Sequence, residues 1–442
     1  MIVKGRVMNV FQVFLVLMLS DGLACHVIIN PMLLDASGRD AWITAIAAGV
    51  FFVPWSLMIV YIMKKSGQQH WREWLGEHMH PVFSWILVVP VLLVMFLQAM
   101  ECVMQTVSWH ITNYLPASNP LQLGMLLIFI CVMLCWWGFR VVAVASGILL
   151  PIVIGLGLLV ASGNSEIKDM SLMLPILEHG WNPVFRGMIY AGAAYSELMY
   201  ILLLQHRIRG RMKAWHMLIY SCVIVTIMVG PIIGAITEFG PEEAANQLTS
   251  PYEQWRLLRI GQYIEHLDFF PIFQWLSGAS IRIALPVLVL AETFASRNEK
   301  ARRIFILAVF LFYGAATFVP LDEYDMYLFM YTYFMPGVTL VLLPASLAWF
   351  IVALCIKPDR RRDSDGGQPQ DGSDGQPEEE GSGQGRRASR RSSRSRIGRA
   401  DLRARSNRIR TSVRTAASLR GKRGARKRKR RRRRLKAGRR RS

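Results

Sequence analysis

The sequence predicts an all-α polytopic membrane protein with ten transmembrane helices, arranged as two inverted repeats of five. Three observations support this prediction. Hydrophobic residues make up 52% of the 442-residue chain, and they gather in ten runs of about 20 residues, the length that crosses ~30 Å of hydrocarbon. Basic residues are concentrated in every second loop, and the first and sixth runs each contain a stretch of small and polar residues.

The predicted spans are separated by short polar loops. The first span follows Lys4 and Arg6 without a small-residue cleavage site, so we interpret it as a retained helix and not as a signal peptide. The loop at residues 237–267 has apolar positions near helical spacing, which indicates a short amphipathic helix at the membrane surface. The ten ranges are residues 7–29, 41–63, 82–112, 121–139, 142–161, 183–204, 215–236, 268–292, 303–320 and 333–356.

The loops predict the orientation of the chain. Before the C-terminal tail, fourteen Lys and Arg residues fall on one side of the predicted membrane and four on the other. Cytoplasmic loops are enriched in Lys and Arg. We therefore expect both termini in the cytoplasm, which requires an even number of spans.

The C-terminal segment differs from the rest in composition. From Lys357 onward the chain holds 32 of its 52 Lys and Arg residues and 9 of its 30 Asp and Glu residues, which leaves 20 basic and 21 acidic residues before it. A membrane domain at residues 1–357 is therefore expected to precede a disordered, Arg-rich tail at 358–442. Anionic lipid or nucleic acid would bind such a tail; the alternative is an extension that only adds positive charge.

Four ionisable side chains lie at membrane depth: Asp21 in span 1, Glu101 in span 3, Glu197 in span 6 and Arg282 in span 8. Such residues are costly there, and they mark functional sites or internal pairs. For Glu101 and Glu197 two interpretations stay open. They couple an ion or a charge to the function, or each forms an internal hydrogen bond or an ion pair with Arg282 and has no further role.

Spans 1 and 6 open the two halves, and the stretches "SDG" and "AGAAYSE" lie at similar depths within them. Inverted repeats with broken first helices bind ligands near the membrane midplane. We expect both helices to be broken here, so that freed backbone groups bind a zwitterionic amino acid; the alternative is tight helix packing through small residues. The candidate binding residues are Ser20, Asp21, Gly22, Ala191, Gly192, Ala193 and Tyr195.

The sequence contains no catalytic constellation, so we do not predict an enzyme. All six cysteines fall in apolar segments, which argues against a disulfide framework or a zinc site. Neither a metal nor a cofactor is expected.

Several stretches resemble a known family in their order and spacing. They are "GRDAWITAIAAG" (38–49), "MECVMQTVSWHITNYLPASNP" (100–120), "WWGFRVVA" (136–143), the Gly and Glu of span 6, and the loop beginning "EFGPEEAANQL" at 238. These stretches resemble the endospore germination permeases, which are the B subunits of nutrient germinant receptors in the amino acid/polyamine/organocation superfamily. The resemblance covers residues 1 to about 357.

The resemblance implies a leucine-transporter-like bundle in the inner membrane of a bacterial spore. Such a subunit works with a larger A subunit and a lipoprotein C subunit, and its binding of a small nutrient, often an amino acid, triggers spore germination. Two features depart from the family pattern: the long basic tail, and Asp21, an acid that would select an amine-bearing ligand, a proton or a sodium ion. Two other functions stay open, an ion-coupled amino acid transporter of the inner membrane and a scaffold that anchors the tail.

Overall fold

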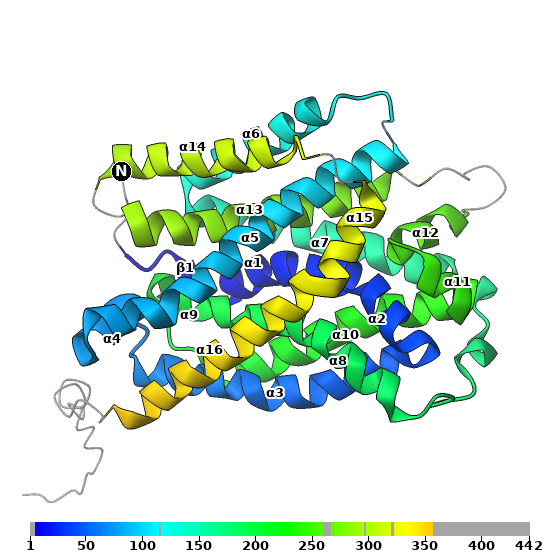
Figure 1. Ribbon diagram of the computed structural model, residues 1–442, viewed down its shortest axis with the longest axis horizontal. Helices are drawn as coiled ribbons and strands as arrows, with labels where there is room; N and C mark the ends of the chain where they lie inside the picture. Colours follow the sequence, from blue (N-terminus) through cyan, green and yellow to red (C-terminus); the bar gives the residue numbers. More distant parts are fainter. Residues whose placement is uncertain are drawn as a thin grey trace, which may run out of the picture. The chain divides into compact units, whose positions relative to one another are not determined.

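The computed structural model describes residues 5–114, 116–259, 267, 269–295, 298–319 and 322–356, so the predicted tail at 358–442 lies outside the described residues. The described chain is almost entirely helical (Figure 1). Its main elements are β1 (Met8–Asn9), α1 (Val10–Leu23), α2 (Asn30–Ser37), α3 (Ala41–Lys65), α4 (Trp71–His78), α5 (Pro81–Asn113), α6 (Pro120–Trp137), α7 (Phe139–Gly163), α8 (Trp181–Ser196), α9 (Tyr200–Leu204), β2 (Ile208–Arg209), α10 (Ala214–Phe239), α11 (Pro241–Asn246), α12 (Ser250–Leu257), α13 (Phe270–Ala295), α14 (Glu299–Ala316), α15 (Glu323–Phe329) and α16 (Met335–Cys355).

Within the described residues, eight helical runs are long and apolar enough to cross a membrane. This confirms an all-α polytopic membrane protein. One of the eight, Val10–Lys65, contains the first two predicted spans. The ninth predicted span falls on α14, which is not among the eight and which begins with four charged residues in its first five positions.

The centre of the bundle is formed by α8, α9 and α13. In the runs Trp181–Arg207 and Phe270–Ala295, 83% and 78% of the most apolar window is buried, against 22% in Phe139–Gly163. Helix α13 packs against α1, α5, α6 and α7, and α8 packs against α2, α3 and α16. Helices α5 and α16 pack against each other and cross the face of the bundle obliquely (Figure 1). Ser277, Ser280 and Arg282 on α13 and Glu197 after α8 are therefore buried polar side chains.

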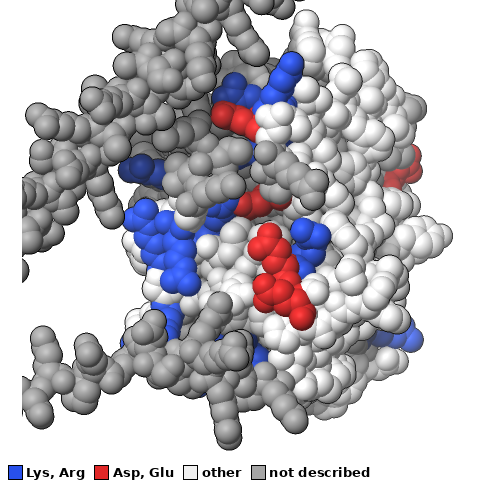
Figure 2. Space-filling model, turned by 90° about the vertical axis from the view of Figure 1, so that its left-hand side faces the viewer, with Lys and Arg blue, Asp and Glu red and all other residues white. Residues whose placement is uncertain are grey.

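A two-residue parallel bridge joins the start of span 1 to the end of span 6. Met8 of β1 pairs with Ile208 of β2, and Asn9 pairs with Arg209. Because β1 directly precedes α1 and β2 follows α9, the start of α1 and the end of α9 lie at the same end of the bundle. Helix α1 therefore runs in the opposite direction to the α8–α9 run. Figure 2 shows Lys and Arg side chains gathered on this end.

Neither span 1 nor span 6 is unwound where the sequence predicted a break. Helix α1 continues through Ser20, Asp21 and Gly22 into a π-helical segment at Ala24–Ile28. Helix α8 continues to Ser196 and is followed by a 3-10 turn at Glu197–Met199. The prediction of broken helices is wrong at these positions, because each helix changes its hydrogen-bonding pattern without unwinding. Such a change keeps most backbone groups bonded inside an apolar bundle, where unbonded groups are costly.

Helices α1 and α13 approach closely at Gly278. A Cβ atom added there would lie 3.0 Å from the Cβ of Leu23 and 3.4 Å from the carbonyl oxygen of Leu19. We expect Gly278→Val to lower the free energy of unfolding by about 1–3 kcal/mol, the usual effect of overpacking. Thermal unfolding of the detergent-solubilised protein measures this loss.

The matched control is Gly155→Val on α7, at an exposed glycine where an added Cβ would meet no described atom within 4 Å. If Gly278→Val unfolds at the same temperature as this control, the close contact between α1 and α13 does not form.

Candidate ligand-binding site

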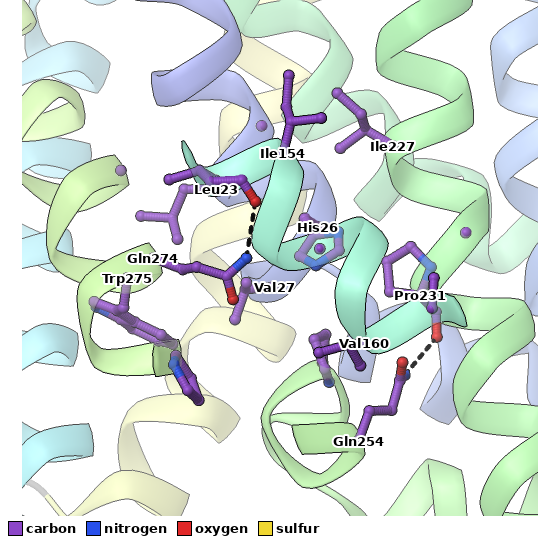
Figure 3. Close-up of a pocket in the computed structure, with 18 of the residues that line it drawn as sticks. Leu23, His26, Val27, Ile154, Val160, Ile227, Pro231, Gln254, Gln274 and Trp275 are labelled. Carbon is purple, nitrogen blue, oxygen red and sulfur yellow. Dashed lines mark hydrogen bonds between the residues drawn. The ribbon is translucent and has the colours of Figure 1, made fainter. Parts of the chain in front are cut away.

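A cavity of about 320 Å³ lies between α1, α7, α10 and α13, and α12 also borders it. Figure 3 shows side chains from these helices converging on the space. Most of the lining is apolar, including Leu23, Val27, Ile154, Val160 and Ile227. The cavity suits a small molecule with an apolar body.

Two glycines leave much of this space open. Gly22 of α1 and Gly230 of α10 both line the cavity. A Cβ atom added to either glycine would meet no described atom within 4 Å, apart from its own helix backbone and chain neighbours. A larger side chain at Gly22 would therefore extend into the cavity without a clash at its first carbon.

An aromatic pair forms one wall. The rings of Trp109 on α5 and Trp275 on α13 are stacked with centroids 4.5 Å apart and an interplanar angle of 5°. The Nε1 of Trp275 donates to the Oγ1 of Thr106 at 2.9 Å, which fixes the ring. This wall offers a rigid apolar surface to a ligand.

The amides of the lining are held by hydrogen bonds. Gln254 of α12 donates from Nε2 to the carbonyl oxygen of Pro231 at 3.0 Å (Figure 3). Gln274 of α13 donates to the carbonyl oxygen of Val153 at 3.0 Å, and its Oε1 accepts from the Nε1 of Trp255 at 3.0 Å. These bonds join α12 to α10 and α13, so they hold the border of the cavity in place.

Proline changes the backbone bonding of α10 beside the cavity. Pro231 has no N–H group, so the carbonyl of Ile227, four residues earlier, loses its usual helical donor. The ring of His26, which follows α1 and lines the cavity, interacts with this carbonyl. The contact connects the π-helical segment after α1 to α10.

A charged group lies on the cavity lining at Lys168, in the segment after α7. Its Nζ donates to the carbonyl oxygen of Ala161 at 2.9 Å and lies 3.6 Å from an oxygen of Glu238. The other carboxylate oxygen of Glu238 accepts from the Nδ2 of Asn164 at 3.0 Å. The lining thus combines a largely apolar surface with one ammonium group.

A buried ion pair lies along α13, one turn beyond Gly278. Arg282 donates from Nη1 and Nη2 to the two carboxylate oxygens of Glu197 at 2.5 and 2.8 Å, and both side chains are 2% exposed. The Nε2 of Gln98 donates to the same carboxylate at 2.9 Å, and Gln98 in turn accepts from the hydroxyl of Tyr200. Of the two interpretations of Glu197, the structure shows the ion pair with Arg282. The pair is bidentate and buried.

The Ser20–Gly22 stretch of span 1 contacts this pair through its backbone. In an α-helix the N–H of Ala24 would bond to the carbonyl of Ser20, but it bonds to Asp21 instead. The Ser20 carbonyl accepts from the Nη1 of Arg282 at 3.3 Å. The buried guanidinium therefore contacts the backbone of α1 close to where the helix type changes.

The other two intramembrane acids do not share the guanidinium in this way. Asp21 accepts from the hydroxyl of Tyr220 at 2.6 Å, and its second oxygen has no hydrogen-bond partner among the described residues. Neither oxygen of Glu101 has a partner among them. Both residues are 2% exposed, so they are buried acids with unused acceptors.

The predicted residues of span 6 do not line the cavity. Gly192 packs against Thr339 of α16, where an added Cβ would lie 3.2 Å from a methyl carbon. Tyr195 donates to the carbonyl oxygen of Ala45 at 3.1 Å and stacks on Phe52 with centroids 4.5 Å apart. Ala191, Ala193 and Tyr195 are buried, and Gly192 is partly buried. Of the seven candidate binding residues, the structure places Gly22 on the cavity.

Sequence reasoning missed most of the cavity, because its walls come from α7, α10, α12 and α13. One signal was present: Gly230 and Pro231 interrupt an apolar run, as Ser20–Gly22 do in span 1. The first part of the predicted amphipathic segment is helical at α12, which is largely buried, and its Gln254 and Trp255 line the cavity. Residues 260–266 of that prediction lie outside the described residues.

Two comparisons with known proteins bear on this site. A family profile described as "Spore germination protein" matches residues 7–318. The chain is also 38% identical to Spore germination protein XB of Bacillus anthracis over 328 residues, which are 74% of this chain and 92% of that relative. The residues matched by the family profile include the helices that form the cavity and the ion pair.

Proposed function

Because the chain belongs to the endospore germination permease family of spore germination proteins, we propose that it is the nutrient-binding subunit of a spore germinant receptor. Nutrient binding in the cavity between α1, α7, α10 and α13 triggers germination. The observation that carries the proposal is this cavity, which Gly22 and Gly230 leave open. The buried ion pair lies next to it, about one helical turn further along α13.

The proposed nutrient is an amino acid with an apolar side chain. Lys168 on the lining suits its carboxylate, and the stacked Trp109 and Trp275 suit an apolar side chain. Asp21 bonds to Tyr220 and is not on the lining, so it does not select an amine directly in this proposal. The proposed site thus keeps Gly22 from the predicted set and replaces the residues of span 6.

The membrane arrangement proposed is ten spans in a 5+5 inverted repeat, in the inner membrane of the spore, with both termini cytoplasmic. The Val10–Lys65 run contributes two spans and α14 one. The opposite directions of α1 and the α8–α9 run support the repeat, and the Lys and Arg on the end with β1 support the orientation (Figure 2). Residues 358–442 form a cytoplasmic tail that binds anionic lipid or nucleic acid, and the receptor includes an A subunit and a lipoprotein C subunit.

The alternative function is an ion-coupled amino acid transporter. The observation in its favour is that Asp21 and Glu101 are buried with unused acceptor oxygens. Uptake of labelled amino acid by the reconstituted full chain, driven by an ion gradient, would favour this alternative over the receptor.

The receptor proposal is tested by screening spores of a strain that lacks this gene against a panel of nutrients. We expect the response to at least one nutrient to be lost and to return when the full-length gene is restored. An unchanged response to every nutrient, in a background without other members of the family, would contradict the proposal.

A further inference from the structure

The described interior contains more negative than positive groups. Asp21 on α1, Glu101 on α5 and Glu197 after α8 lie with Arg282 of α13 in one electrostatic cluster, and each of the four side chains is 2% exposed. The charged groups that interact with Glu101 are Arg282 and Glu197, and Asp21 interacts with the same pair from α1. The cluster therefore contains three carboxyl groups and one guanidinium.

Among the three acids, the guanidinium of Arg282 forms hydrogen bonds with Glu197. Two of its nitrogens bond to the two oxygens of that carboxylate, and Nη1 also reaches the Ser20 carbonyl. The Nε of Arg282 has no acceptor among the described residues. The positive charge of Arg282 therefore balances Glu197 and leaves Glu101 uncompensated.

An ionised carboxylate without a partner is not tolerated in such surroundings. Both oxygens of Glu101 lack a hydrogen-bond partner among the described residues, and transferring an isolated carboxylate into an apolar interior costs so much that the group takes up a proton instead. Hard metal cations need several oxygen ligands. The ligand that fits Glu101 is a proton.

We propose that Glu101 is a proton-binding site, neutral in this state beside the ionised pair of Glu197 and Arg282. A proton leaves Glu101 for water when Arg282 turns part of its guanidinium toward it. Helix α1 controls that movement, because it carries both Gly22 on the cavity and the Ser20 carbonyl that holds Nη1. This control by the cavity rests on the proposed function; the proton site does not.

The test is infrared spectroscopy of the full chain in liposomes, without nutrient. We expect the carbonyl band of a protonated carboxylic acid in neutral buffer, and its loss in Glu101→Gln. The control is Glu77→Gln, which removes an exposed acid on α4 and should leave the band unchanged. Labelling only the glutamates isotopically should shift the band, which separates Glu101 from Asp21 even if the variant inserts poorly.

Three results would overturn the proton site: no acid band in the wild type, no acid band that glutamate labelling shifts, or a glutamate band that persists unchanged in Glu101→Gln. Thermal unfolding gives a second check. Because glutamine has the shape of the neutral acid, Glu101→Gln should unfold at nearly the wild-type temperature, and a large fall would show that Glu101 is ionised and paired. The measurements use no nutrient, so a failure of the nutrient-binding proposal would leave them unaffected.

Discussion

Gly22→Leu is expected to abolish the nutrient response of spores while the protein still reaches the membrane. Gly22 lies on the cavity lining, and an added Cβ would meet no described atom within 4 Å apart from its own helix backbone and chain neighbours. Leucine also has a higher helix propensity than glycine, which lies roughly 0.8–1 kcal/mol below alanine. The substitution therefore fills the ligand space without weakening α1. Germination on nutrients that activate the wild type, together with an immunoblot of spore membranes, measures both effects.

Two further leucine substitutions make this result interpretable. Gly155→Leu lies on an exposed part of α7, away from the cavity, and should respond normally. Gly192→Leu would push against Thr339 and should lower the amount of protein in the membrane, so its effect reports packing. A normal response in Gly22→Leu would mean that nutrients do not bind in this cavity.

Glu197→Gln is expected to lower the free energy of unfolding by about 3–5 kcal/mol. The change removes the carboxylate that bonds to two nitrogens of Arg282 and leaves a guanidinium buried with 2% exposure. Breaking a buried pair on one side costs this much because the remaining charge is uncompensated. Thermal unfolding of the solubilised protein measures the loss.

The control for the ion pair is Glu178→Gln, which breaks the Arg39–Glu178 pair at 3.0 Å, where the glutamate is 45% exposed. Exposed pairs contribute about 0.2–1 kcal/mol. The double variant Glu197→Leu with Arg282→Leu should lose less stability than the two single changes together, because it leaves no unpaired charge. Equal losses in Glu197→Gln and Glu178→Gln would contradict the pairing.

The helices could be predicted from the sequence because span length and apolarity are local properties. The predicted range 41–63 corresponds to α3 at Ala41–Lys65, and 82–112 corresponds to α5 at Pro81–Asn113. The last predicted span began too late, since the helical run starts with α15 at Glu323 and passes through a π-helical segment at Met330–Phe334. Acidic and aromatic residues lower the apolarity of its first turns, so the start of the helix was not predicted.

The site was harder to predict because a glycine has the same appearance in a tight helix contact and beside a cavity. Gly22 and Gly192 both lie among small residues, but the rotation of each helix turns the first toward open space and the second toward Thr339. The charged residues within the spans predicted the contacts of the site better than the glycines did. Glu197 and Arg282 were among the predicted partners and are paired, whereas Glu101, which had the same two interpretations, has no hydrogen-bond partner among the described residues. Which acid forms the ion pair with Arg282 depends on the packing of α5, α8 and α13.

The most direct test of nutrient binding is a calorimetric titration of the purified full chain with L-valine, L-leucine and L-lysine. We expect the wild type and Gly155→Leu to bind at least one of the two apolar amino acids more tightly than L-lysine, and Gly22→Leu to bind neither. Equal binding of the apolar amino acids by the wild type and Gly22→Leu, or binding of L-lysine alone, would contradict a nutrient site in the cavity between α1, α7, α10 and α13.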